Sequence, residues 1–254
     1  MKTRIPALIA SLAFGCSLAL SSVATATAAA PILAGGPAGR GVCATQFAAL
    51  KPPVTVDALR AFGDCEIARR FTPLDALQTK VSGSKVLTTS DSAALSAEVG
   101  ATKTGLTELK ATIDAETAIP ALKADVVAIA TKFRVYLLVA PQVHLVTAAD
   151  GVMASQAAFT RVDANLSGRI AAAKAAGKDM MAAQSDLDAM NAAVAQAIGL
   201  ATPLSATLLP LTPAGYNSGT AEPILNSART ALLQARDLLK SAVQDARACR
   251  VALA

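Results

Sequence analysis

Apolar residues recur along most of this chain at gaps that alternate between three and four positions. This spacing places apolar side chains on one face of successive α-helices, beginning near residue 57. We expect a first helix over 57–81, kinked or restarted at Thr72–Pro73, because proline cannot donate a helical hydrogen bond. A second helix is expected to start at Ser90 or Asp91, both good caps, and to continue through Ile113.

The same periodicity continues to the C-terminus. It predicts four further helices, over 117–140, 141–176, 179–208 and 220–253. Gly177 and Asp179 are natural stop and start residues between two of these helices, and Pro203 is expected to bend the helix in which it lies. The segment 209–219 is rich in helix breakers and is expected to be a loop.

Strand signals are weak throughout, so the pattern predicts an all-α protein. We call the stripe of apolar residues along each helix its seam. A seam with gaps of three and four positions favours an elongated antiparallel helical bundle with coiled-coil-like packing. We expect about six helices, arranged as two three-helix units over 56–140 and 141–254. The units would lie end to end if the chain is only kinked at Pro141 and side by side if it turns there, and the sequence leaves both open.

The stretch 133–146 is the most apolar run after the N-terminal segment, and we expect it to form a buried joint between the two sets of helices. It contains Tyr136 and His144, the only histidine of the chain. No Asp or Glu neighbours His144 in the sequence, so we interpret it as a neutral histidine bonded to a backbone carbonyl. Tyr136 and His144 are nevertheless the residues expected to border any ligand held between the helices.

The first residues follow the plan of a secretory signal peptide: the basic head Met1–Arg4, an apolar run, and then small residues. We expect residues 1–28 to be removed and 29–55 to form a flexible arm, with no transmembrane segment after cleavage. An uncleaved anchor helix and lipidation at Cys16 are alternatives. The sequence thus predicts a secreted or cell-envelope-associated protein.

Three cysteines follow the signal segment. We prefer a disulfide between Cys43 and Cys65, because they are close in sequence and flank the start of the first long helix. Cys249 occupies a seam position and is expected to be a buried, unreactive thiol. Cys43–Cys249 and Cys65–Cys249 are the competing pairs, and either would bring the two ends of the chain together.

Charge and motifs exclude several functions. The chain has 23 basic and 18 acidic side chains, and loss of Lys2 and Arg4 would reduce the excess to three, which is too mild to indicate nucleic-acid binding. Neither a C-x-x-C zinc motif nor a G-x-S-x-G elbow occurs. We therefore predict no catalytic residues, no cofactor and no metal. The basic residues within 229–250 are a weak candidate surface for anionic cell-wall polymers.

Three stretches resemble a group of secreted, alanine-rich helical-bundle proteins of actinobacteria. They are Arg134–Leu145, Lys123–Val126 and the run Leu209-Pro210-Leu211-Thr212-Pro213-Ala214-Gly215-Tyr216. The resemblance, which extends over most of the chain after the signal segment, implies export and a helical bundle. It brings no activity and no catalytic residues.

We therefore expect a non-catalytic, exported scaffold or interaction protein of the bacterial cell envelope. Its partner would be another protein or a cell-wall polymer, with self-association as a further possibility. The alternative is a carrier that binds an apolar ligand between helices near Tyr136 and His144, because helical bundles can hold ligands in their cores.

Overall fold

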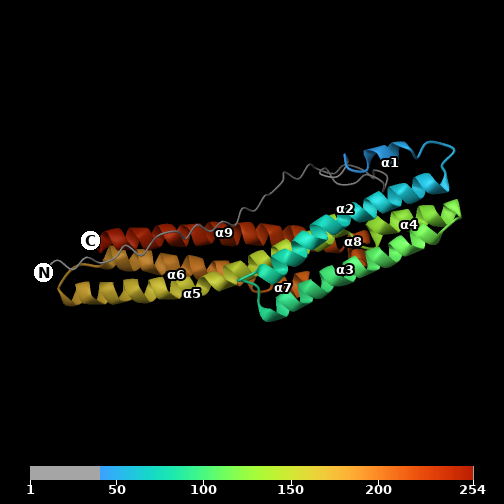
Figure 1. Cartoon of the computed structure of the whole chain (residues 1–254). Helices are drawn as coiled ribbons and strands as arrows, with labels where there is room; N and C mark the ends of the chain where they lie inside the picture. Colours follow the sequence, from blue (N-terminus) through green and yellow to red (C-terminus); the bar gives the residue numbers. More distant parts are fainter. Residues whose placement is uncertain (1–40, 254) are drawn as a thin grey trace. The chain divides into compact units, whose positions relative to one another are not determined.

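The computed structural model describes residues 41–253, and every regular element in that range is a helix (Figure 1). This confirms the all-α class. The predicted signal peptide and the first part of the predicted arm lie outside the described residues. The described part of the arm contains one short helix, α1 (Ala44–Ala48), instead of being irregular throughout.

The first half of the described chain contains α2 (Val56–Gly83), α3 (Thr89–Ala115) and α4 (Ile119–Thr131). Each of these three helices contacts the other two, and Figure 1 shows them running side by side. The predicted restart at Pro73 is wrong, since α2 is continuous through it. The cap of α3 is Thr88, earlier than predicted, because its Oγ1 accepts a hydrogen bond from the Asp91 N–H at 3.1 Å.

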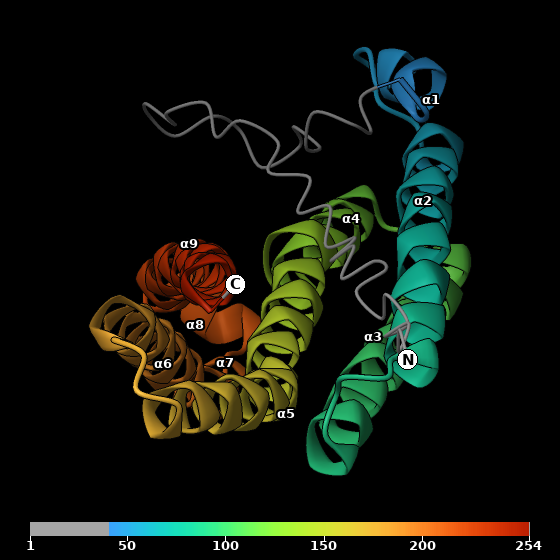
Figure 2. The ribbon, with the colours of Figure 1, turned by 90° about the vertical axis from the view of Figure 1, so that its left-hand side faces the viewer.

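The second half begins with a π-helical turn, η1 (Val135–Val139), which leads directly into α5 (Ala140–Ala175). Four further helices follow: α6 (Met181–Ala201), α7 (Leu204–Leu208), α8 (Pro213–Asn217) and α9 (Ala221–Ala252). The helices α5, α6 and α9 contact one another, and α5 also contacts α2. Figure 2 shows α5 between the α2–α3 pair and the α6–α9 pair.

Two predicted helices are divided in the structure. The helix predicted over 117–140 ends at Thr131, and the interruption precedes Pro141, which lies in the first turn of α5, where proline is tolerated. The interruption is centred on Arg134, whose left-handed backbone has φ 44°. The helix predicted over 179–208 separates into α6 and α7 at Thr202–Pro203. The predicted loop 209–219 contains α8.

The left-handed residue and the π turn change which side chains of the 133–146 stretch face the core. Val135, Leu138 and Val139 are buried, whereas Tyr136 is 37% exposed and Leu137 46% exposed. The continuous helix that we predicted would have placed Tyr136 on the buried face. The prediction of a wholly buried joint is therefore wrong for this residue, because the helical phase shifts at the interruption.

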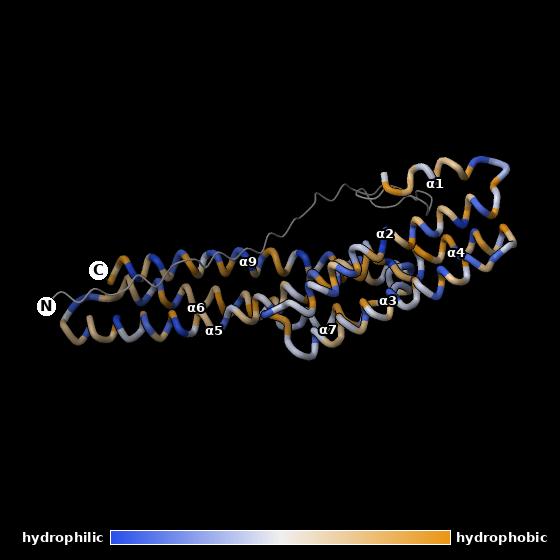
Figure 3. Tube along the Cα trace, viewed as in Figure 1, coloured by the Kyte–Doolittle hydropathy of each residue, from blue (hydrophilic) through white to orange (hydrophobic). Residues whose placement is uncertain are grey.

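Buried apolar side chains form two clusters. The larger one unites α2, α3, α4, η1 and the first part of α5 with α7, the end of α6 and the first half of α9. The second joins the C-terminal part of α5 to α6 and to the end of α9, where Leu166, Met190 and Cys249 are buried. Figure 3 shows apolar and polar positions alternating along these helices, as the sequence periodicity predicted.

The segment Ile119–Ala175 contains one window that is long and apolar enough to cross a membrane by length and composition alone. Forty-four per cent of that window is buried inside the protein. A core helix of a soluble protein passes the same test, so the window by itself does not indicate a membrane span.

Candidate functional site

Tyr136 contacts α2 at the place where Pro73 interrupts the hydrogen bonding of that helix. Proline has no backbone N–H, so the carbonyl four residues earlier, which belongs to Arg69, has no helical partner. The Tyr136 hydroxyl donates a hydrogen bond of 2.8 Å to this carbonyl. The tyrosine thus replaces the donor that proline lacks, which helps α2 to continue through Pro73.

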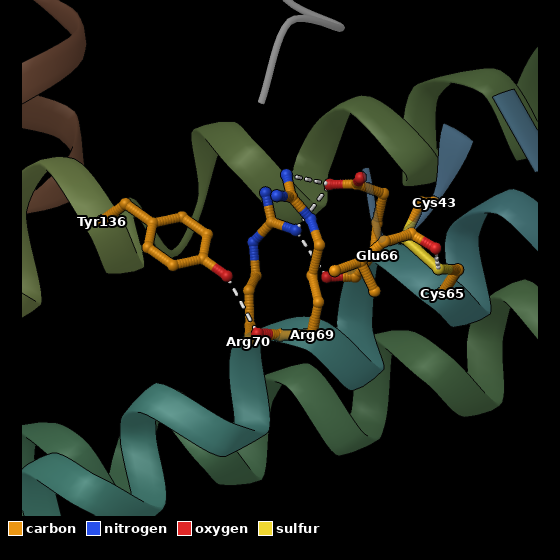
Figure 4. Close-up of a disulfide and its surroundings, with 7 residues drawn as sticks. Cys43, Cys65, Glu66, Arg69, Arg70 and Tyr136 are labelled. Carbon is orange, nitrogen blue, oxygen red and sulfur yellow. Dashed lines mark hydrogen bonds and ion pairs between the residues drawn. A yellow bond between two sulfur atoms is a disulfide. The ribbon is translucent and has the colours of Figure 1, made fainter. Parts of the chain in front are cut away.

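Two arginines of α2 lie beside the Tyr136 ring, with a glutamate of the same helix beyond them (Figure 4), and we call these four residues the Arg69–Arg70 cluster. Glu66, Arg69 and Arg70 share a helix face because they are separated by three and four positions. One carboxylate oxygen of Glu66, Oε2, accepts hydrogen bonds of 2.7 Å from Arg69 Nη2 and from Arg70 Nη1. The side chains of Arg69 and Arg70 are only 5% and 6% exposed, and that of Glu66 is 14% exposed.

The guanidinium groups of this cluster also interact with an aromatic ring. Their central carbons lie 5.4 Å and 5.6 Å from the centre of the Tyr136 ring, within the range of cation–π attraction. Figure 4 shows the two groups beside each other, between Tyr136 and Glu66. Burial lowers the pKa of Arg70, and its hydrogen bond to Glu66 opposes that effect. The cluster therefore combines two nearly buried cations with one carboxylate.

A disulfide lies next to the cluster. It joins Cys43 to Cys65, the residue before Glu66, with a Cα–Cα distance of 5.8 Å (Figure 4). The bond attaches the segment before α2 to that helix, and the Phe47 and Phe62 ring centres lie 5.8 Å apart. This is the pair that the sequence favoured, and the competing pairs with Cys249 do not form in the structure. Within residues 41–253 Cys249 is a free, buried thiol, and burial raises its pKa.

Arg134, at the interruption after α4, makes a second arginine–tyrosine contact. Its Nε donates a hydrogen bond of 2.6 Å to Asn217 Oδ1, and its guanidinium lies 5.3 Å from the centre of the Tyr216 ring. Asn217 in turn donates a hydrogen bond of 2.9 Å from Nδ2 to the Thr131 carbonyl at the end of α4. These contacts attach α8 to the end of α4.

Gln142 makes the corresponding connection between α5 and the segment after α7. Its side-chain Nε2 donates hydrogen bonds of 2.7 Å and 3.2 Å to the carbonyls of Leu208 and Leu209, and the residue is 1% exposed. Its Oε1 is buried and has no hydrogen-bond partner within the described part of the chain. The amide thus binds the carbonyls at the end of α7: that of Leu209, and that of Leu208, which also accepts a hydrogen bond of 3.1 Å from the Leu211 N–H.

His144 lies elsewhere and is exposed, so the prediction that it bonds a backbone carbonyl in the core is wrong. Its Nδ1 lies 2.7 Å from Lys80 Nζ, which can donate to the neutral ring. Partial burial of the ring and the nearby Lys80 ammonium lower the pKa of His144. Lys80 follows Arg69 by eleven positions in α2, about 16 Å along the helix axis. The structure therefore places His144 and Tyr136 at separate points of the α2 surface.

Asp150 of α5 connects to the start of α3. Its Oδ2 accepts a hydrogen bond of 2.8 Å from the backbone N–H of Thr88, the cap of α3. Both Asp150 and the nearby Asp91 are buried. Burial, together with the proximity of Asp91, raises the pKa of Asp150, and the Thr88 hydrogen bond opposes that shift. This contact is structural, since it fixes the α2–α3 connection against α5.

The described side chains form no metal centre, and two surface depressions lie away from Tyr136 and His144. Within residues 41–253 no three His, Cys, Asp or Glu side chains come together as a possible metal site. One surface depression lies between α5 and α6 around Phe159 and Asn191. Another lies at the turn between these helices around Lys178 and Met180. Tyr136 and His144 line neither depression.

Sequence reasoning identified Tyr136 but missed the residues with which it interacts. Glu66, Arg69 and Arg70 looked like ordinary surface residues of an amphipathic helix. The available signal was the combination of a Glu-x-x-Arg-Arg spacing with Pro73 four residues after Arg69, which removes the helical partner of the Arg69 carbonyl. Gln142 gave a weaker signal, as a polar residue inside the most apolar run.

Comparison with known proteins adds no family and no activity: no protein-family model, no curated protein and no solved structure matches this chain.

Proposed function

We propose that this chain is an exported, non-catalytic helical scaffold or interaction protein of the bacterial cell envelope. One observation supports it most: the polar side chains where α4 passes into α5 connect helices to one another. Tyr136 bonds α2, Arg134 bonds α8, and Gln142 bonds the carbonyl at the end of α7. Side chains used in this way strengthen the framework, and none of these three is paired with a second group for acid–base or nucleophilic chemistry within residues 41–253.

The architecture that we propose for this scaffold is an elongated one with two three-helix units. The mutual contacts of α2, α3 and α4, and those of α5, α6 and α9, support this division. The larger apolar cluster crosses the boundary near residue 140, which supports units that share a core at the start of α5. Small-angle scattering of the purified protein tests the proposal: a maximum dimension expected for a sphere of this mass would contradict it.

Export is supported by the Cys43–Cys65 disulfide, since such bonds persist mainly outside the reducing cytoplasm. Fusion of residues 1–40 to a reporter that is active only after export tests this step. The matched control carries Asp substitutions in the apolar run 5–20, which should abolish export. An active control fusion, or an inactive native fusion, would contradict the proposed location.

Native mass spectrometry of protein purified from its own host tests the scaffold role against the carrier alternative. We expect the mass of the polypeptide alone or of a complex with another macromolecule. Chemical cross-linking of intact cells should then give reproducible cross-links to an envelope component. A stoichiometric apolar small molecule retained in the spectrum would instead support the carrier, and turnover of a substrate by the pure protein would overturn the non-catalytic assignment.

A further inference from the structure

The Arg69–Arg70 cluster has a charge and hydrogen-bonding imbalance that its neighbours do not correct. Two guanidinium groups, 5% and 6% exposed, face a single carboxylate, so the cluster retains one positive charge in a nearly dry environment. A charge in such surroundings is costly unless an opposite charge lies close to it. The lowered pKa of Arg70, caused first by burial, agrees with this excess.

Most of the guanidinium donors are also unused. Only Arg69 Nη2 and Arg70 Nη1 donate hydrogen bonds within the described part of the chain, and both donate to Glu66. The Nε of Arg69 is buried and has no hydrogen-bond partner among residues 41–253. A buried N–H without an acceptor costs free energy, so such groups normally have a partner. An unpartnered donor on a nearly buried arginine points to an acceptor from another molecule.

We propose that the Arg69–Arg70 cluster binds the carboxylate group of a ligand. A carboxylate supplies one negative charge, which is the charge that the cluster lacks. It is planar and has two oxygens, so it fits the edge of a guanidinium with two parallel hydrogen bonds. A phosphate monoester carries close to two negative charges and a bulkier tetrahedral shape, which suits these nearly buried side chains less well.

The side of the cluster formed by η1 provides the way in. Tyr136, whose ring contacts both guanidinium groups, is 37% exposed, and its neighbour Leu137 is 46% exposed. Tyr136 is fixed at its hydroxyl by the Arg69 carbonyl, so the ring is held in position before a ligand arrives. The ligand would place its carboxylate on the arginines and an adjoining apolar part on Tyr136 and Leu137. This site does not depend on the scaffold proposal, because it rests on the cluster alone.

Nuclear magnetic resonance of the arginine Nε–Hε groups in the oxidised, purified protein tests the proposal. Sodium acetate is the probe, and sodium chloride and sodium phosphate at equal ionic strength are the comparisons. We expect a saturable shift of the Arg69 Nε–Hε signal with acetate, and a linear, much smaller change with chloride. The Arg69→Lys variant assigns the signal by its loss.

Variants distinguish binding at the Arg69–Arg70 cluster from nonspecific attraction of anions to the basic surface. Arg70→Lys should weaken acetate binding about tenfold, because the planar fork is lost while the charge remains. Glu66→Gln should strengthen it, because the competing internal carboxylate is removed. Arg229→Lys on α9, a half-buried arginine that bonds Asn226 at 2.7 Å, is the matched control and should leave binding unchanged.

Three results would overturn the proposal. The first is the absence of a saturable shift in the unaltered protein, a measurement that needs no variant to fold. The second is equal binding of chloride or tighter binding of phosphate, which would reject the carboxylate as the preferred group. The third is an equal loss of binding in Arg229→Lys, which would indicate attraction by the basic surface as a whole.

Discussion

The passage from α4 to α5 and the packing of α6 against α9 represent two different ways of fixing helices. In the first, side chains with specific partners determine where the helices lie: Tyr136 on the Arg69 carbonyl, Arg134 on Asn217, and Gln142 on the Leu208 carbonyl. Within the described residues, no side-chain hydrogen bond joins α6 to α9. Their contact depends on buried alanines such as Ala197 and Ala242, both 0% exposed.

The comparison shows that regular and irregular regions are destabilised by different kinds of substitution. Small residues let two helices approach closely, so the α6–α9 contact is sensitive to added volume. The α4–α5 passage contains a left-handed arginine and a π turn, so it is sensitive to the loss of polar partners that hold an unusual backbone. Four predictions test this contrast, from the largest expected effect to the smallest.

The disulfide beside the Arg69–Arg70 cluster should contribute the largest single effect. Replacing Cys43 and Cys65 together by alanine is expected to lower the free energy of unfolding by about 3 kcal/mol, because the unfolded chain gains the freedom of an opened loop. Denaturant unfolding measures this difference. Cys249→Ala is the control and should cost about 1 kcal/mol, the effect of removing one buried sulfur atom. Equal losses in the two variants would contradict the assignment.

A larger side chain between α5, α6 and α9 should lower the free energy of unfolding by nearly as much. Ala242→Leu places three extra carbons at a position that is 0% exposed and is expected to cost about 2 kcal/mol. Ala248→Leu, at an exposed position of the same helix, should change stability by less than about 0.5 kcal/mol. Thermal or urea unfolding compares the two. A tolerated leucine at 242 would mean that the helices are less closely packed than described.

Loss of a polar partner should harm the α4–α5 passage without any change of volume. Gln142→Leu leaves the Leu209 carbonyl without its side-chain donor, while the Leu208 carbonyl keeps the Leu211 N–H, and is expected to cost about 1.5 kcal/mol. Gln196→Leu on the exposed face of α6 is the matched control and should be close to neutral. If both variants unfold alike, the buried amide does not stabilise this connection.

His144 should make the stability of the folded protein slightly dependent on pH. Its folded-state pKa lies below the unfolded value of about 6.5, because partial burial and Lys80 disfavour the charged ring. The associated stability is present above the unfolded pKa and is lost as pH falls through the folded pKa. Unfolding midpoints between pH 7.5 and pH 5 should therefore fall more steeply for the native protein than for His144→Gln. Parallel curves would show that the histidine is not coupled to folding.

Much of the fold was predictable from periodicity alone. The three/four spacing of apolar residues predicted the all-α class and the long helices that became α2, α3, α5 and α9, because one apolar stripe per helix must be buried. Cysteine positions favoured the Cys43–Cys65 pair, and the seam position of Cys249 indicated its burial. These features depend on local spacing, which a sequence displays directly.

The Arg69–Arg70 cluster and the α4–α5 passage were decided only by the tertiary structure. Nothing near Tyr136 in the sequence shows that its hydroxyl meets a carbonyl left free by Pro73, 63 positions earlier. Likewise, the left-handed Arg134 depends on Asn217, 83 positions further along the chain. The sequence by itself determined the long helices and, outside the 133–146 stretch, which of their faces are buried. Long-range polar partners determined where those helices break and continue, because unsatisfied carbonyls and charges must find partners wherever the fold brings them.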